Sequence, residues 1–275
     1  MKHLKSLFEI SDSFDNYIVD LWGVIHNGLN LLDGVQETLS FLKDQGKQVI
    51  FLSNAPRRAY HVASDLVHLG LEADQYLALH TSGEDAFEAF KHQQDPQYAH
   101  LGHKCYLISS ANHDHLIEDC NLERVGSLDE AQFLFNTGPD QRSLQSADAY
   151  RKLFQQAITR DLLMICVNPD ISVIHGAQEL LCAGSFAKSY EQMGGRVSYH
   201  GKPFPSVYES VMRKFPNPDK GRTLAIGDGL QTDIQGAKLF GLQCALVLSG
   251  LTRENHLDST LTPMTTPDYI LPSFG

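Results

Sequence analysis

Four polar positions along the chain have residue types that could hold a metal ion and an anion. Asp20 follows the apolar run Tyr17–Val19, Ser53 and Asn54 follow a second apolar run, Lys202 lies in a Gly-Lys-Pro turn, and Asp228 follows a late apolar run. Carboxylates can bind a divalent cation or act as nucleophiles, while hydroxyl and ammonium groups can stabilise a phosphate. Each position alone is also typical of an ordinary helix cap or turn. Their order along the chain is therefore the informative feature.

These residues must be positioned by the elements that precede them. Short apolar runs alternate with amphipathic helical patterns, which predicts an α/β fold with parallel strands. Ligands bind at the carboxyl edge of such sheets, so the four positions are expected to converge there. Strands are expected at 17–19, 48–52, 105–108, 133–135, 162–167, 223–226, 244–248 and 269–271, and helices near 35–45, 56–69, 113–119, 147–159 and 206–215.

Four segments resemble the sequence motifs of the haloacid dehalogenase superfamily, in the family's order. They are YIVDLWGVIHNG at 17–28, FLSN at 51–54, HGKP at 200–203 and AIGDGLQTD at 225–233. More than a hundred residues separate the second motif from the third, and VNPD at 167–170 and AGSFAK at 183–188 are similar to class IIA members, whose large cap is itself α/β. The resemblance implies a doubly wound, Rossmann-like core of residues 1–80 and 195–275, with an inserted α/β cap of residues 81–194.

The resemblance also implies a magnesium (Mg2+) site and a catalytic aspartate. Asp20 would be the nucleophile that forms an aspartyl-phosphate. Asp20, the backbone carbonyl of Trp22 and Asp228 would hold the metal, and Asp233 would steady its waters. An acid in the first turn of a helix, which is the alternative for Asp233, is also favourable in its own right.

The same resemblance assigns the groups that bind the substrate. Ser53 and the backbone at Asn54 would hold phosphate oxygens, and Lys202 would neutralise charge between the nucleophile and the phosphate. In the cap, Asn168, Asp170 and His175 occupy the region that lines the substrate pocket in relatives. Asn168-Pro169-Asp170 also has the composition of a turn, so direct substrate contact by these residues is left open.

Trp22 departs from the pattern of the phosphatases in this superfamily. Those enzymes carry a second aspartate at this position, which protonates the leaving group and then activates water. A positioned acid/base contributes roughly 10²–10⁴-fold, so ordinary alkyl phosphates are expected to react slowly. His26 lies in the same segment and titrates near neutrality, so it could replace the acid or simply pack there.

The composition of the chain indicates which compartment and which kinds of binding partner to expect. The chain has 275 residues, a hydrophobic content of 42% and a net charge of -11, which argues against binding to nucleic acid or to an anionic membrane. Five cysteines without a C-x-x-C pair favour reduced thiols in a cytoplasmic protein. No stretch approaches the roughly 18 apolar residues that span a bilayer. The resemblance leaves a homodimer through the cap open.

Three functions are compatible with these features of the sequence. The first is a magnesium-dependent hydrolase that acts on a small phosphorylated metabolite and is weak on ordinary phosphomonoesters. The second is a catalytically impaired protein that binds a phosphometabolite or has a regulatory role, and the third is a hydrolase that uses Asp20 on a non-phosphate substrate. A dinucleotide-binding oxidoreductase is excluded, because no G-x-G-x-x-G follows the first strand.

Overall fold

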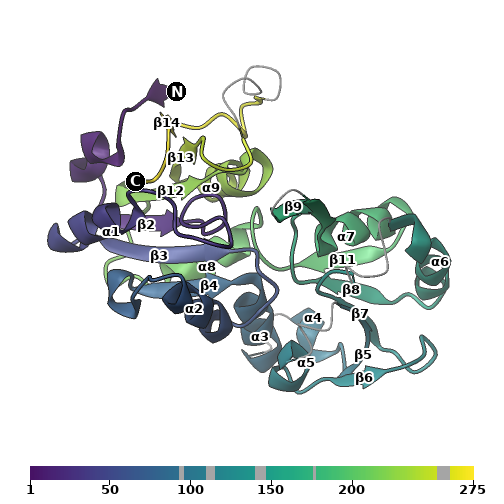
Figure 1. Cartoon of the computed structure of the whole chain (residues 1–275). Helices are drawn as coiled ribbons and strands as arrows, with labels where there is room; N and C mark the ends of the chain where they lie inside the picture. The colour runs from purple at the N-terminus through teal and green to yellow at the C-terminus, as the bar shows by residue number, and fades with distance from the viewer. Residues whose placement is uncertain (93–95, 110–114, 140–146, 176–177, 253–260) are drawn as a thin grey trace. The chain divides into compact units, whose positions relative to one another are not determined.

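The computed structural model describes residues 1–92, 96–109, 115–139, 147–175, 178–252 and 261–275 (Figure 1). It divides the chain into two compact units. Unit 1 contains Met1–Ser53, Ala59–His80 and Lys202–Gly275, and unit 2 contains Asn54–Arg58 and Thr81–Gly201. No helix in the described ranges is long and apolar enough to cross a membrane.

Unit 1 is built on a seven-stranded sheet with the order β1-β14-β13-β12-β2-β3-β4. The pairings from β1 through β3 are all parallel. In the middle of the sheet, Val19 of β2 lies beside Ile226 of β12 and beside Phe51 of β3. The strands are β1 (Lys2–His3), β2 (Asn16–Val19), β3 (Gln48–Ser53), β4 (Ala78–Thr81), β12 (Thr223–Gly227), β13 (Gln243–Val247) and β14 (Tyr269–Leu271).

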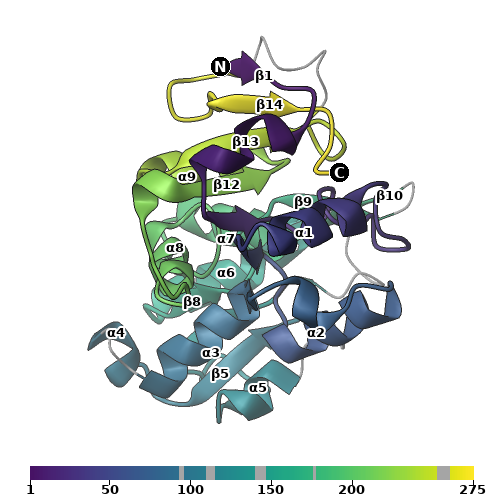
Figure 2. The same ribbon diagram turned by 90° about the vertical axis from the view of Figure 1, so that its left-hand side faces the viewer.

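Helices cover both faces of this sheet because its strands are apolar on both sides. Ile18 and Ile50 pack in a cluster with α8 and α9, while the alternate residues Tyr17 and Phe51 point to the opposite face and are also fully buried. Figure 2 shows the helices beside the strands. The helices of unit 1 are α1 (Val35–Asp44), α2 (Ala59–His68), α8 (Pro205–Met212) and α9 (Gln235–Phe240), with short helical turns at η1 (Leu7–Ser13), η2 (Ala73–Gln75), η5 (Lys220–Arg222) and η6 (Leu230–Ile234).

Unit 2 has a parallel sheet of its own, with the order β11-β8-β7-β5-β6. Two apolar clusters lie on its two faces, one with α3 and α5 and the other with α6 and α7. An antiparallel hairpin of β9 and β10 stands apart from the sheet. The elements are α3 (Ser82–His92), α4 (Pro96–Ala99), β5 (Lys104–Ile108), α5 (His115–Asp119), β6 (Glu123–Val125), β7 (Phe133–Asn136), η4 (Ala147–Tyr150), α6 (Arg151–Thr159), β8 (Leu163–Cys166), β9 (Ser172–His175), β10 (Gln178–Leu181), α7 (Ala183–Gln192) and β11 (Arg196–Tyr199).

The predicted α/β class with two parallel sheets is confirmed, whereas some element boundaries differ. The helix predicted to open at Pro56 begins at Ala59, and the first residues of the helix predicted at 113–119 lie outside the described residues. Unit 2 extends to Gly201, because β11 pairs with β8.

Candidate active site

The carboxyl ends of three neighbouring strands position the polar residues of unit 1. Asp20 follows β2, Ser53 ends β3, and Asp228 follows β12, which lies on the other side of β2. The backbone N–H of Asp20 donates to the carbonyl of Ile226 at 2.9 Å, so the parallel ladder continues to the site itself. This edge is the place where open α/β sheets bind ligands.

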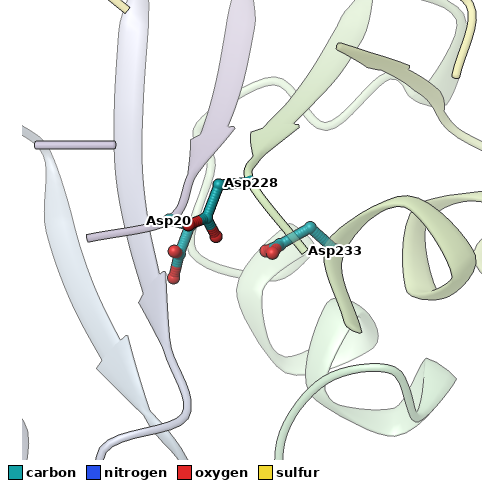
Figure 3. Close-up of side chains that lie close together, drawn as sticks. All are labelled: Asp20, Asp228 and Asp233. Atoms are coloured by element: carbon teal, nitrogen blue, oxygen red, sulfur yellow. The ribbon is translucent and has the colours of Figure 1, made fainter. Parts of the chain in front are cut away.

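Three carboxylates converge at this edge (Figure 3). Asp20, Asp228 and Asp233 each offer one oxygen, and these oxygens lie within 4.8 Å of one another. All three residues are buried, with 8%, 2% and 6% of their surfaces exposed. Buried carboxylates close together are costly unless a cation offsets their charge, and hard oxygen donors are the ligands that magnesium prefers. The donor set therefore fits the metal that the resemblance implies.

The loop that follows β13 holds Asp228 in place. Its Oδ2 accepts from the N–H of Leu251 at 2.7 Å, and the Thr252 hydroxyl donates to its carbonyl at 2.7 Å. A Cβ at Gly250 would lie 1.8 Å from Asp228 Oδ2. Only glycine leaves room for the carboxylate here, so the loop after β13 is part of the site.

Lys202 connects two of the three carboxylates. Its amine donates to Asp20 Oδ1 at 2.5 Å, to Asp233 Oδ1 at 2.8 Å and to the carbonyl of Leu52 at 3.0 Å. An ammonium has three donors, and each of them has an acceptor here. The ammonium offsets only one of the three carboxylates, so the cluster retains negative charge for a divalent cation.

Burial is the largest single influence on the pKa values of Asp20 and Lys202. It raises the pKa of Asp20, and the charges of Asp233 and Asp228 raise it further, while Lys202 opposes them. Burial alone would lower the pKa of Lys202, but the neighbouring carboxylates outweigh that effect and raise it. Lys202 is therefore an ammonium at neutral pH. A bound cation would favour the ionised form of Asp20, which is the nucleophilic form.

Trp22 packs within the segment that follows β2. Its ring lies edge-on to His26, with ring centroids 5.2 Å apart, and a Cβ at Gly28 would come within 2.4 Å of the indole. His26 Nδ1 accepts from the N–H of Gly28 at 3.0 Å, and burial lowers the pKa of His26. A neutral His26 with Nδ1 as acceptor carries its proton on Nε2, and a neutral imidazole is a poor proton donor to a leaving group. The geometry favours packing for His26.

The remaining predicted residues lie in unit 2. Asn54 Nδ2 donates to Asp170 Oδ1 at 2.8 Å, and the N–H of Asp170 donates to Asn168 Oδ1 at 3.0 Å. The second bond is an Asx-turn, so the turn predicted at Asn168-Pro169-Asp170 is present. His175 ends β9, and its side chain lies outside the described part of the structure.

Sequence reasoning missed several groups at this edge. The Leu52 carbonyl, Gly250, the Leu251 amide and the Thr252 hydroxyl all contact the acidic cluster or its lysine. Backbone groups leave no signal in side-chain chemistry. The Ser249-Gly250 pair directly after a predicted strand was the available sign, because it marks a loop at the same edge.

Comparison with known proteins places this geometry in a family. A haloacid dehalogenase-like hydrolase family matches residues 17–123, and a second family, described as HAD-hydrolase-like, matches residues 199–275. The chain is 25% identical over 295 residues to a 4-nitrophenylphosphatase of Schizosaccharomyces pombe, covering 98% of this chain and 95% of that protein. It is 24% identical to the ribonucleotide monophosphatase NagD of Escherichia coli, covering 94% of this chain and 96% of that protein.

A solved structure agrees with both sheets. A haloacid dehalogenase-like hydrolase from Brucella suis is 28% identical and superposes with a TM-score of 0.85, covering 99% of this chain and 100% of that one. The parallel core sheet and the separate parallel cap sheet are therefore those of this fold. The chain is therefore a haloacid dehalogenase-like hydrolase, similar over nearly its whole length to NagD and to a 4-nitrophenylphosphatase.

Proposed function

We propose that this protein is a magnesium-dependent phosphatase that uses Asp20 as its nucleophile and favours leaving groups that depart without protonation. The observation that carries the proposal is the arrangement of Asp20, Lys202, Asp228 and Asp233 at one sheet edge. The names of the relatives, a 4-nitrophenylphosphatase and a ribonucleotide monophosphatase, support a small phosphorylated metabolite as substrate.

The residues of this chain divide the reaction into two displacements. The Asp20 carboxylate attacks phosphorus, the bond to the leaving oxygen breaks, and the leaving group keeps the electron pair. Water then attacks the phosphorus of the aspartyl-phosphate, Asp20 departs as a carboxylate, and inorganic phosphate is released. Splitting one difficult step into two easier ones is the advantage of a covalent nucleophile.

Charge stabilisation comes from groups around the phosphorus. Lys202 supplies a fixed positive charge beside Asp20, and Ser53 with the backbone at Asn54 would bind phosphate oxygens. When bound, magnesium would neutralise charge on the phosphoryl oxygens, held by Asp20, Asp228 and the carbonyl of Trp22, with Asp233 beside them. Phosphoryl transfer depends mainly on this kind of positioning and neutralisation.

This site is poorly suited to protonating the leaving group. Trp22 stands where phosphatases of the family carry an aspartate, and residues 21–32 include no carboxylic acid. The indole packs against Gly28 and His26, and His26 accepts a backbone hydrogen bond through Nδ1. Reactivity should therefore depend steeply on the basicity of the leaving group.

A comparison of substrates with magnesium tests this proposal. Acetyl phosphate and 4-nitrophenyl phosphate should be hydrolysed measurably, whereas glycerol phosphate should react barely at all. Trp22→Asp should raise the rate on glycerol phosphate by up to roughly 10²-fold, because a carboxylic acid then occupies the acid position. Asp20→Asn should remove activity in both backgrounds, and a thermal melt should show that each variant is folded.

Three results would overturn the proposal. Equal kcat/KM for alkyl and aryl phosphates in the wild-type protein would mean that another group supplies the proton. Binding of orthovanadate with magnesium, but no turnover of any substrate by either protein, would favour a phosphometabolite-binding or regulatory function. Turnover of a carbon-centred substrate that requires Asp20, without phosphatase activity, would favour the non-phosphate alternative.

A further inference from the structure

Three polar side chains that are distant in sequence meet in the interior of unit 2. His200 Nδ1 lies 2.7 Å from Asp85 Oδ2, and His200 Nε2 lies 2.5 Å from the hydroxyl of Tyr98. Only 6% of His200, 7% of Asp85 and 5% of Tyr98 is exposed. We call Asp85, Tyr98 and His200 the His200 cluster.

The cluster has a definite protonation pattern. The Asp85 carboxylate can only accept, so His200 Nδ1 carries a proton and donates it. His200 Nε2 pairs with the Tyr98 hydroxyl, which also lies 3.2 Å from Ser198 Oγ. Asp85 sits in the first turn of α3, where the helix dipole also favours a negative charge. Every ring nitrogen of His200 therefore has a partner, and the ring has one fixed orientation.

Burying a polar cluster of this kind costs more free energy than filling the same space with apolar side chains. Removing a carboxylate and an imidazole from water costs free energy that well-packed apolar side chains of similar volume would not. What the cluster provides is a fixed position, since the hydrogen bonds of a fully satisfied network specify geometry more narrowly than apolar packing does. The chain position that it fixes is residue 200.

Residue 200 adjoins the lysine of the acidic site. His200 follows β11, its N–H donates to the carbonyl of Cys166 at 2.9 Å, and only Gly201 separates it from Lys202. Gly201 has a φ of +112°, and a Cβ there would lie 2.5 Å from Asn54 Oδ1 and from Ser82 Oγ. Residue 201 must therefore be a glycine for the chain to follow this path.

The two ends of this short segment are thus anchored separately. The His200 cluster holds the ring and the backbone before Gly201, and Asp20, Leu52 and Asp233 hold the amine of Lys202. A shift of the backbone at residue 200 reaches Lys202 through a single glycine. The amine of Lys202 would then move relative to the nucleophile.

We propose that Asp85 and Tyr98 are positioning residues for Lys202, acting through the ring of His200. The proposal rests on the proposed function, in which Lys202 neutralises charge that develops between Asp20 and phosphorus. That charge is greatest in the transition state, so a misplaced amine lowers kcat more than it changes KM. Misplacement by about 1 Å can reduce the rate by roughly 10²-fold.

Removing one hydroxyl tests the proposal with little disturbance of packing. Tyr98→Phe should lower kcat by about 10-fold and leave KM within about twofold, because the Nε2 anchor is lost. Tyr190→Phe is the matched control in the same unit, since the Tyr190 hydroxyl is also buried and donates to the Leu162 carbonyl at 2.7 Å. It should lower the melting temperature without changing kcat.

A conservative variant gives the second test. Asp85→Ala should lower kcat by up to about 10²-fold, whereas Asp85→Asn should restore most of it, because the amide oxygen still accepts from Nδ1. In ¹⁵N spectra of the histidine rings, wild type and Asp85→Asn should show a protonated Nδ1 for His200. Asp85→Ala should lose this signature. If Asp85→Asn is as impaired as Asp85→Ala although it keeps the Nδ1 signature, the proposal is wrong.

The proposal can be separated from the proposed function. If the wild-type protein hydrolyses no substrate, orthovanadate binding in the presence of magnesium replaces kcat as the readout. Weaker binding by Tyr98→Phe than by Tyr190→Phe would support the positioning role, and equal binding would overturn it. Likewise, an active enzyme in which both tyrosine variants lose kcat in proportion to their stability would show that the cluster is only structural.

Discussion

Asp228 is the residue through which the metal-binding part of the site can be tested most directly. Only 2% of it is exposed, and its Oδ2 is fixed by the Leu251 amide. It belongs to the three-carboxylate cluster, whereas the amine of Lys202 bonds to the other two members, Asp20 and Asp233. A change at Asp228 therefore affects a bound cation more directly than it affects the ammonium.

Asp228→Asn should weaken magnesium binding by at least about 10-fold, because an amide removes one negative charge from the donor set. Titration calorimetry with magnesium alone measures this. Asp219→Asn is a suitable control, since Asp219 accepts from the Gly221 amide before β12, at the opposite end of the strand from the cluster. Equal magnesium affinity in wild type and Asp228→Asn would mean that the cation binds elsewhere.

Single residues differ in how far the sequence reveals them. Asp20, Lys202, Asp228 and Asp233 could be selected because they lie in segments that resemble the family motifs in the family's order, and the structure brings them together. The His200 cluster could not be selected. Asp85 and Tyr98 lie on different helices over a hundred residues from His200, and only the tertiary fold brings them together.

At the scale of elements, the segment Asn54–Arg58 shows how tertiary contacts override local signals. Pro56 is a favourable first residue for a helix, yet α2 begins at Ala59. The Thr81 hydroxyl donates to the Arg57 carbonyl at 2.5 Å, and the Gly83 amide donates to the Ala55 carbonyl at 3.2 Å. These tertiary bonds hold residues 55–57 in a non-helical path before α2.

Arg58 holds the same segment through its side chain. It forms two hydrogen bonds with Glu84 of α3 and one of 2.9 Å with Asp119 of α5, and its guanidinium stacks on Phe87 at 3.4 Å. Its side chain is only 14% exposed. A planar fork of donors suits this bidentate and stacked site, whereas lysine would offer a single ammonium.

Arg58→Lys should therefore reduce the free energy of unfolding of unit 2 by about 1–3 kcal/mol. Urea unfolding followed by circular dichroism reports both units, whereas the single tryptophan, Trp22, reports unit 1. Arg160→Lys is the control, since its pair with Asp129 is exposed and should contribute less than about 1 kcal/mol. No shift in the circular dichroism midpoint for Arg58→Lys would contradict the stabilising role of these Arg58 contacts.

The strands β4 and β11, which the sequence did not reveal, have only a weak apolar pattern. β4 and β11 are four residues long, and β11 contains Arg196 and Ser198 at the edge of its sheet. Short edge strands with polar residues lack the apolar run that identifies a buried strand. The central strands β2, β7 and β12 are buried along their whole length, which is why their positions could be predicted closely.

At the scale of the whole molecule, all five cysteines are free thiols inside the two units. Burial raises the pKa of four of them to about 12 and raises that of the fifth as well. The thiolate is the reactive form, so these thiols should be inert while the protein is folded. The four thiols with a pKa of about 12 are those of Cys105, Cys120, Cys182 and Cys244, and the fifth is that of Cys166.

A thiol reagent such as 5,5′-dithiobis(2-nitrobenzoic acid) should thus react slowly with the native protein at pH 8, and with all five thiols of the chain in denaturant. The native rate should follow opening of the structure rather than reagent access at the surface. Glutathione, mixed with the native protein, is the control for reagent activity. One thiol that reacts within seconds in the native state would show that part of the core is open.

The division of the chain into units sets the order in which its parts can be completed during synthesis. Every stretch of unit 2 precedes residue 202, so the ribosome has made all of it before Lys202 emerges. The sheet of unit 1 has no such independence, because β2 lies between β3 and β12, and β12 begins only at Thr223. The apolar strand β2 must therefore wait, unpaired on its β12 side, until Thr223–Gly227 has been translated, whereas both neighbours of β3 are made early. Nascent chains in which early strands await late partners are exposed to aggregation, so the rate at which translation finishes becomes a determinant of the yield of folded enzyme.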